Sequence, residues 1–355
     1  MGNQASITKT GAGNGDLNAG SATSIRQNAG LRGGSAANSA MIRQIGNNNG
    51  GTVIDQNNLS VQNQANIGQG VGSGGATNNS ASVTQTDNSR RNQATVGQEG
   101  SAKTAEVRQS LISADNRISV TQTGVDGTAI VYQTDNATHN EATVGQTGMG
   151  SGNSATIYQT DQSHYNQATI GQTGLNSGAF INQSTQSANG KAEIEQGTGG
   201  SNNNAVITQT YTYEGGSAGA NTGLGTSNQA RIVQNRTTSS QSGNSASVQQ
   251  GFEGGTSPVT GQATVSTGNK ATVSQENDEN GTNLAQGGKN NTATVEQRGY
   301  GTLQGLLSSD PAVQYGNNNS LRVTQTGAMG APGIANVSQI GNNNTGVITQ
   351  TGAQN

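Results

Sequence analysis

The stretch GNSATIYQTDQSHYNQATIGQTG, residues 152–174, contains nearly the same phrase twice, NSATIYQ and NQATIGQ. The shared pattern is Asn-x-Ala-x-(Val/Ile)-x-Gln, in which the named residues occupy every second position. Side chains two residues apart lie on one face of a β-strand, so Asn, Ala, Val/Ile and Gln share a face. The positions between them hold polar or small residues that suit a solvated face. Each phrase therefore predicts one strand, and TDQSHY between them predicts a turn.

The phrase recurs along almost the whole chain, in about 25 copies. Its closing glutamines stand at positions 85, 98, 109, 122, 133 and 146, which are 13 or 11 residues apart, so every second one follows after 24 residues. Alternate copies also differ in the residues that follow them. These observations predict an all-β solenoid, a cross-β stack with two strands per rung, where a rung is one full turn of the coil. We expect about 24 residues per rung and roughly 12 rungs.

The composition favours such a stack over a conventional globular core. The 355 residues include 55 Gly, three Pro, no Cys and no Trp, and only 28% are hydrophobic and 10% charged. Abundant Asn and Gln with low charge and few prolines are typical of chains that form cross-β structure. A thin core of Ala and Val/Ile suffices if the Asn and Gln amides of successive rungs bond to one another.

We predict that the inner residues of the regular copies form the ladder on which assembly depends. In the best-conforming segment these residues are Asn140, Ala142, Val144, Gln146, Asn153, Ala155, Ile157, Gln159, Asn166, Ala168, Ile170 and Gln172.

A single solenoid is expected over residues 1–355, with loop insertions at about 211–227, 251–258 and 299–316, where the repeat is interrupted. Repeats run from Asn3 to Gln350, so we expect no end caps. An uncapped terminal strand offers unpaired N–H and C=O groups to another chain, whereas soluble solenoids carry polar caps. The sequence therefore predicts end-to-end polymerisation.

Other function classes lack their usual sequence features. A formal net charge of −3 provides no basic surface for nucleic acid, and no apolar run approaches the roughly 20 residues of a membrane helix. No catalytic triad, nucleotide-binding glycine motif or metal-ligand spacing stands out. We expect no enzymatic activity, no cofactor and no metal. The first residues do not form a signal peptide, so a removed leader is expected.

Two histidines and two tyrosines can be interpreted either as binding residues or as ordinary surface residues. His139 and His164 lie one rung apart in turns, and we interpret them as solvated turn residues, with metal binding as the alternative. Tyr132 and Tyr158 each precede a closing glutamine, so we expect them to stack on the outer face. A platform for dyes or glycans is the alternative for this pair.

A column of acidic residues is also predicted. Asp87, Asp135 and Asp161 recur at one turn position, which indicates turn-forming residues and not a pair for acid–base catalysis. Stacked like charges also restrain aggregation. Weak binding of divalent cations along this column is the alternative.

Several copies resemble the repeats of the curlin family, the subunits of bacterial curli amyloid fibres. They are QIGNNN at 44–49 and 339–344, NSATIYQTD at 153–161 and NNTATVEQRG at 290–299. The resemblance covers nearly the whole chain. The common 13-residue step, however, puts two more residues in the turn than the tight turn of the family has. It implies an extracellular, self-assembling fibre subunit of a biofilm matrix, serving adhesion and surface colonisation and exported unfolded. The implied partners are further copies of the chain, a nucleator subunit and an outer-membrane export pore.

Two other functional hypotheses remain open. One is a soluble binding solenoid, specifically an ice-binding one, whose outer threonines order water. These are Thr95, Thr143, Thr156, Thr169, Thr264, Thr272 and Thr294, interrupted by Glu106, Ser119, Ile130 and Phe180. The other is a cell-surface adhesin that projects a tip domain, which is disfavoured because the repeats leave no segment for a tip.

Overall fold

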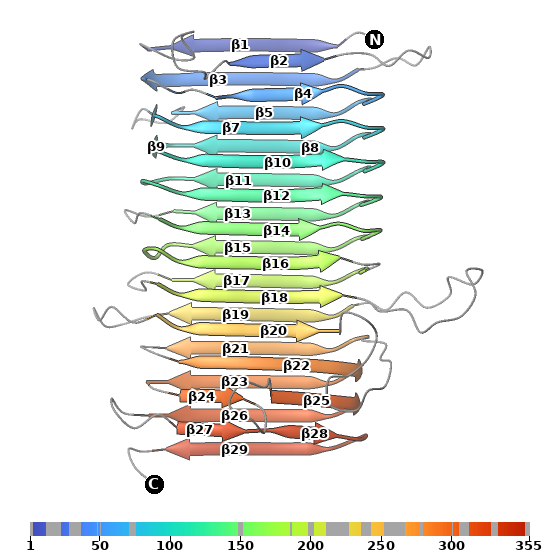
Figure 1. Cartoon of the computed structure of the whole chain (residues 1–355), viewed down its shortest axis with the longest axis vertical. Helices are drawn as coiled ribbons and strands as arrows, with labels where there is room; N and C mark the ends of the chain where they lie inside the picture. The colour runs from blue at the N-terminus through green and yellow to red at the C-terminus, as the bar shows by residue number, and fades with distance from the viewer. Residues whose placement is uncertain are drawn as a thin grey trace, which may run out of the picture. The chain divides into compact units, whose positions relative to one another are not determined.

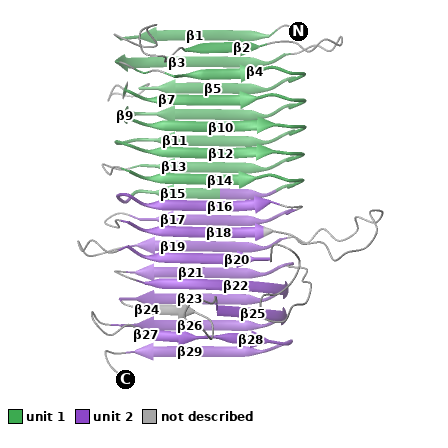
Figure 2. Ribbon diagram, viewed as in Figure 1, with its two compact units in different colours: residues 1–165, 169–173 green, residues 166–168, 174–355 purple. Residues whose placement is uncertain are grey.

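In a computed structural model of the chain, most of the described residues form β-strands. The described residues are 3–11, 23–27, 37–47, 49, 51–70, 76–147, 152–184, 187–197, 202–210, 227–235, 243–251, 267–276, 280–299, 301–304, 312–327 and 333–351. They contain 29 strands and no helix. The chain divides into two compact units, Met1–Tyr165 with Thr169–Thr173, and Asn166–Ala168 with Gly174–Asn355 (Figure 2). Each unit has two parallel sheets in a β-solenoid, which confirms the predicted fold class.

Unit 1 alternates strands between its two sheets, and the arrows of one sheet point opposite to those of the other (Figure 1). The first sheet contains β1 (Gln4–Thr10), β3 (Ser39–Asn47), β5 (Gln64–Gln69), β8 (Gln93–Gln98), β11 (Arg117–Gln122) and β13 (Glu141–Gln146). The second contains β2 (Ser24–Gln27), β4 (Val53–Gln56), β7 (Ser80–Gln85), β10 (Thr104–Ser110), β12 (Thr128–Thr134) and β14 (Ser154–Gln159). Short strands β6 (Ala76–Thr77) and β9 (Gly100–Ser101) pair in the turns.

Unit 2 repeats this arrangement, and strand β15 (Gln167–Gln172) is divided between the units. Its first sheet contains β17 (Lys191–Gln196), β19 (Gln229–Asn235), β21 (Lys270–Glu276), β23 (Thr292–Arg298), β26 (Ser320–Thr326) and β29 (Thr345–Thr351). Its second contains β16 (Gly178–Ser184), β18 (Asn204–Thr210), β20 (Ser245–Gln250), β22 (Gly281–Lys289), β24 (Gly301–Gln304) with β25 (Ala312–Asn317), and β27 (Gly333–Asn336) with β28 (Ser338–Ile340).

Successive strands of a sheet pair in register, like residue on like residue. Between β10 and β12, for example, Ala105 pairs with Ala129, and Gln109 with Gln133. The predicted period of 24 holds between Gln85 and Gln133. Other turns range from 22 residues, between Gln275 and Gln297, to 41 residues, between Gln209 and Gln250, and the mean is about 26 residues per turn. Extra residues thus enter the turns without disturbing the pairing of the strands.

The core is a thin layer of inner side chains between the two sheets. In β14, the inner residues Ala155, Ile157 and Gln159 are fully buried, whereas Ser154 and Thr156 on the outer face reach solvent. The same alternation recurs in most strands because a period of two places every second side chain inside. The core is therefore made of single columns of Ala, Val/Ile and Gln.

The interruptions of the repeat differ from the prediction in one place. The segment 299–316 was expected to be a loop insertion, but its ends form strands β24 and β25, which both pair with β22. The sheet thus accepts two short strands where it otherwise has one. The insertions predicted at 211–227 and 251–258 lie outside the described residues except for Ser227 and Gly251.

Glycines in this fold have two different roles. Gly100 has a φ of +96°, and a Cβ at this position would collide with the backbone carbonyl of Gly124 in the next turn. Gly171 lies within β15, and a Cβ there would meet no atom within 4 Å. The turn requires glycine at the first position, but the strand does not require it at the second.

Substitution of these two glycines tests the close approach of successive turns. Gly100→Ala should lower the free energy of unfolding by at least about 1–2 kcal/mol, because the left-handed backbone and the facing carbonyl exclude a side chain. Gly171→Ala should leave it unchanged or raise it by about 0.5–1 kcal/mol. Denaturant unfolding of both variants measures the difference, and equal losses would contradict the stacked turns.

Candidate functional site

Columns of glutamine amides run through the interior of each unit. In unit 1, each Nε2 donates a hydrogen bond to the Oε1 of the glutamine in the next rung, as from Gln98 to Gln122 (2.9 Å) and from Gln122 to Gln146 (2.7 Å). The facing sheet has the same column, in which Gln85 donates to Gln109 (2.8 Å). The columns of unit 2 follow the same rule, for example from Gln297 to Gln325 (2.8 Å).

The second hydrogen of each amide ties the two sheets together. Nε2 of Gln146 in β13 also donates to the carbonyl of Thr128 in β12, across the core (2.9 Å). Gln122 makes the same bond to Thr104 (3.2 Å). Both N–H groups and the oxygen of a buried amide are thereby satisfied, which removes the penalty for burying it.

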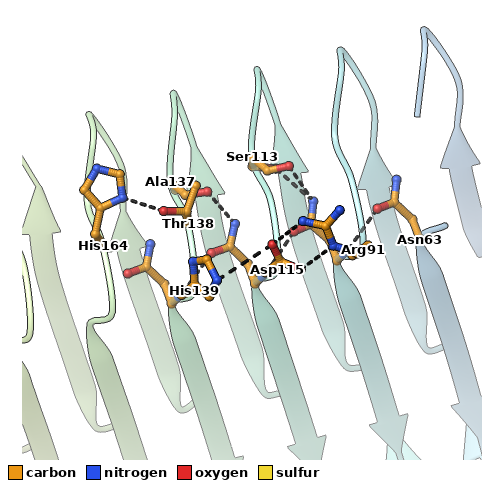
Figure 3. Close-up of polar contacts among 11 residues, drawn as sticks. Asn63, Arg91, Ser113, Asp115, Ala137, Thr138, His139 and His164 are labelled. Atoms are coloured by element: carbon orange, nitrogen blue, oxygen red, sulfur yellow. Dashed lines mark hydrogen bonds and ion pairs between the residues drawn. The ribbon is translucent and has the colours of Figure 1, made fainter. Parts of the chain in front are cut away.

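A second ladder, of asparagines, fixes the turns that lead into the first sheet (Figure 3). Oδ1 of Asn92 accepts the backbone N–H of Asn116, and Oδ1 of Asn116 accepts that of Asn140 (3.0 and 2.9 Å). Nδ2 of Asn92 donates to the carbonyl and hydroxyl oxygens of Ser113 in the next turn. Each asparagine therefore holds the turn of the following rung.

The structure brings the predicted ladder residues together on the inner face. All twelve are buried, with exposed fractions of 5% or less: Asn140, Ala142, Val144, Gln146, Asn153, Ala155, Ile157, Gln159, Asn166, Ala168, Ile170 and Gln172. Their part in assembly stays a prediction.

Two lysines replace ladder amides, and the repeat pattern does not explain either. Lys103 takes the place of an asparagine, is 1% exposed, and its Nζ has no hydrogen-bond partner in the described part of the chain. Burial lowers its pKa, and the charge of Asp126 opposes this shift. Lys9 in β1 takes the place of a glutamine, opposite Gln44. A departure from the phrase is the only signal that finds such positions in the sequence.

A column of unlike side chains borders the asparagine ladder in unit 1 (Figure 3). The Nε and Nη2 atoms of Arg91 each lie 2.6 Å from an oxygen of Asp115, and Nε2 of His139 lies 3.8 Å from Asp115. The ring of His139 stacks on Tyr165 at 4.6 Å between centroids. The Arg91 guanidinium lowers the pKa of the Asp115 carboxyl. Successive turns therefore interact through side chains that the phrase leaves variable.

The two histidines do not share a partner. Nδ1 of His164 contacts the hydroxyl of Thr138, while His139 faces Asp115. His164 is half-buried, and its pKa is lowered first by this burial and then by the proximity of His139. The described residues contain no group of three or more His, Cys, Asp or Glu side chains able to hold a metal ion.

The acidic column is not continuous. Asp87, Asp135 and Asp161 all have positive φ, and each accepts a hydrogen bond from the hydroxyl of the preceding threonine. Backbone bonds between turns place Leu111 between Asp87 and Asp135. Only Asp135 and Asp161 are therefore neighbours in the column.

The outer faces carry the predicted tyrosine stack and a divided threonine array. The Tyr132 and Tyr158 rings stack at 5.3 Å, as predicted, and burial with a hydrogen bond to Glu106 raises the pKa of Tyr132 to about 12. Thr95 and Thr143 both pair with Ser119 on the first sheet. Of the other threonines, Thr156 lies on the second sheet, Thr169 in β15, Thr272 and Thr294 pair in unit 2, and Thr264 lies outside the described residues.

No protein-family model and no curated protein matches this chain. Among the described residues, no helix is long and apolar enough to span a membrane. The curlin resemblance therefore rests on the repeat itself.

Removal of one ladder amide tests how much the glutamines stabilise the fold. Gln146→Ala deletes two donated bonds and the acceptor of the Gln122 amide, and should lower the free energy of unfolding by roughly 2–4 kcal/mol. Thr143→Ala, on the outer face of the same strand, should change it by less than about 0.5 kcal/mol. Equal effects in chemical denaturation would contradict a structural ladder.

The half-buried His164 should make stability depend on pH. Because its folded pKa lies below the unfolded value of about 6.5, the unfolded chain takes up the proton first as the pH falls. The stability that neutral His164 contributes is complete above pH 6.5 and is lost as the pH falls through the lower folded pKa. His164→Gln should remove this slope in unfolding measured between about pH 7 and 5. Thr138→Val keeps the histidine buried and should retain most of this pH dependence. An unchanged slope in His164→Gln would show that His164 is not its source.

Proposed function

We propose that the chain is the structural subunit of an extracellular amyloid-type fibre that grows by end-to-end stacking of solenoid rungs. One observation supports this proposal most directly: inner-column residues of the outermost strands are uncovered. Ile7 in β1 is 44% exposed, whereas its partner Ile42 in β3 is fully buried. In β29, Ile348 is half-buried, whereas its partner Val323 is fully buried.

The free edge of β29 has the properties of a template for a further strand. It pairs with β26 on one side and with no other strand in the described part of the chain. Its sequence TGVITQT contains no charge and no proline, the devices that usually protect an edge. A second copy that stacked here would extend the same ladder of backbone and glutamine bonds.

The biological setting of the proposal comes from the curlin resemblance. This resemblance supports a fibre of a biofilm matrix that serves adhesion and surface colonisation. A nucleator subunit and an outer-membrane export pore belong to the same proposal.

A water-ordering surface is the second candidate. The column of Thr95, Ser119 and Thr143 on the first sheet of unit 1 favours it, because these small hydroxyl side chains pair in register. It is weakened because Thr156 lies on the second sheet and because, in unit 2, the charged Arg231 pairs with Thr272 at the same outer position. Thermal hysteresis of the monomeric chain, with no fibres formed, would support this candidate against the fibre.

Charges placed on the two faces of β29 test stacking at this edge. Ile348→Lys buries an ammonium group in any added rung and should slow seeded fibre growth at least about tenfold, since a buried unpaired charge costs several kcal/mol. Val347→Lys, on the outer face of the same strand, should grow nearly as the unmodified chain does. Electron microscopy and fibre diffraction, with a reflection at about 4.7–4.8 Å, follow the product. Persistent monomers of the unmodified chain would overturn the proposal, and equal growth of both variants would overturn stacking at β29.

A further inference from the structure

A groove runs over four successive turns of unit 1, where the second sheet leads into the first. Its volume is about 500 Å³, which is within the range of small-molecule sites. The lining residues are Asn58, Leu59, Asp87, Asn88, Leu111, Ile112, Asp135 and Asn136.

The fold does not require apolar residues in this groove. Leu59, Leu111 and Ile112 are 46%, 40% and 55% exposed. Leu111 and Ile112 also have φ values of 57° and 65°, a region that bulky and β-branched residues rarely adopt. The equivalent positions of the neighbouring turns hold Asp-Asn pairs, which tolerate this backbone and are solvated readily. Exposure and backbone strain thus both disfavour the pair Leu111–Ile112.

Carboxylates flank the apolar pair on both sides. The turn of Asp87 bonds to the turn of Leu111, through the N–H of Ile112 and the carbonyl of Asp87 (2.9 Å), and Asn136 bonds in the same way to Leu111 (2.9 Å). Within the part of the chain that the structure describes, the side chains of Asp87 and Asp135 accept hydrogen bonds from neutral donors only. Neither forms an ion pair with any residue that the structure describes.

The negative charge of Asp87 affects the neighbouring carboxyl group of Asp55. The pKa of Asp55 is raised, first by burial and also by the charge of Asp87, while Arg26 opposes this shift. The groove therefore offers two carboxylates that have no cationic partner among the described residues and that are separated by an apolar floor.

We propose that this groove binds a linear aliphatic diamine, extended along the stacking direction. Asp87 and Asp135 lie two strand spacings apart, roughly 9.5 Å, and each carboxylate pairs with one ammonium group. The methylene chain between the two ammonium groups packs on Leu111 and Ile112. A divalent cation would leave the apolar floor uncovered, and a monoamine would leave one carboxylate unpaired.

This site is separate from the edges proposed for assembly. Its residues lie in the turns between Gln56 and Asn140, and none belongs to β1 or β29. Binding can therefore be measured on the full chain whether or not it forms fibres, and the failure of either proposal leaves the other standing.

Calorimetric titration of the full-length chain with diaminohexane tests the proposal, with diaminobutane, hexylamine and calcium as comparisons. Diaminohexane should bind more tightly than the other three. Asp135→Asn should weaken its binding about tenfold, because a hydrogen bond to a charged group is lost. Ile112→Asn should also weaken binding while stability stays equal or rises, because Asn suits the left-handed turn. Asp161→Asn, in the next turn outside the groove, should bind as the unmodified chain does.

Three outcomes would overturn the site. Equal binding of hexylamine would show that a single carboxylate suffices. Calcium binding with the same dependence on Asp135 would show a simple cation site. Unchanged diaminohexane binding in both Asp135→Asn and Ile112→Asn would place any binding elsewhere on the chain.

Discussion

The amide hydrogen bond between glutamines of successive rungs sets the register on which the remaining structure depends. A strand shifted by one residue would turn every inner side chain outward and bury the outer ones. It would also leave the amides of two neighbouring rungs, such as Gln98 and Gln146 around Gln122, without the partners they have now. A made hydrogen bond contributes little net stability, but an unmade one in the interior costs about 1–3 kcal/mol. The ladder therefore acts mainly by excluding other registers.

This constraint explains how so few apolar residues suffice. Each rung buries mainly Ala and Val/Ile from each strand, for example Ala155 and Ile157, which leaves a core one side chain wide. A conventional domain of this size would need more hydrophobic surface than 28% of the residues supply. Here the strands are long-range partners in a backbone ladder, and the Gln amides of the ladder are buried at little cost because they are hydrogen-bonded from rung to rung, as from Gln122 to Gln146. Polar residues thus occupy positions that large apolar side chains fill elsewhere.

The repeat made the fold predictable because strand positions obey one rule in every copy. The inner columns could be assigned from Asn153 to Gln172 with no knowledge of contacts, since a period of two fixes the face of each side chain. The turns could not be assigned, because their contacts depend on which unlike residues meet in adjacent rungs, as Arg91, Asp115 and His139 do. Lys103 was missed because it occupies a ladder position without the ladder chemistry. Strands β24 and β25 were missed because neither contains the full phrase.

The ladder also has a direction, which constrains any assembly built from it. In both units the hydrogen bonds between ladder glutamines are donated toward higher residue numbers, from Gln44 to Gln69 as from Gln325 to Gln350. A stack of such amides presents acceptor oxygens at one edge and N–H groups at the other. Joining two like edges sets donor against donor or acceptor against acceptor, whereas joining unlike edges continues the column. A fibre that retains this ladder must therefore be polar, with each copy oriented as the one before it. Lys9, which has no acceptor, stands at the ladder position of β1, so even the favoured junction replaces one amide bond there by a different contact.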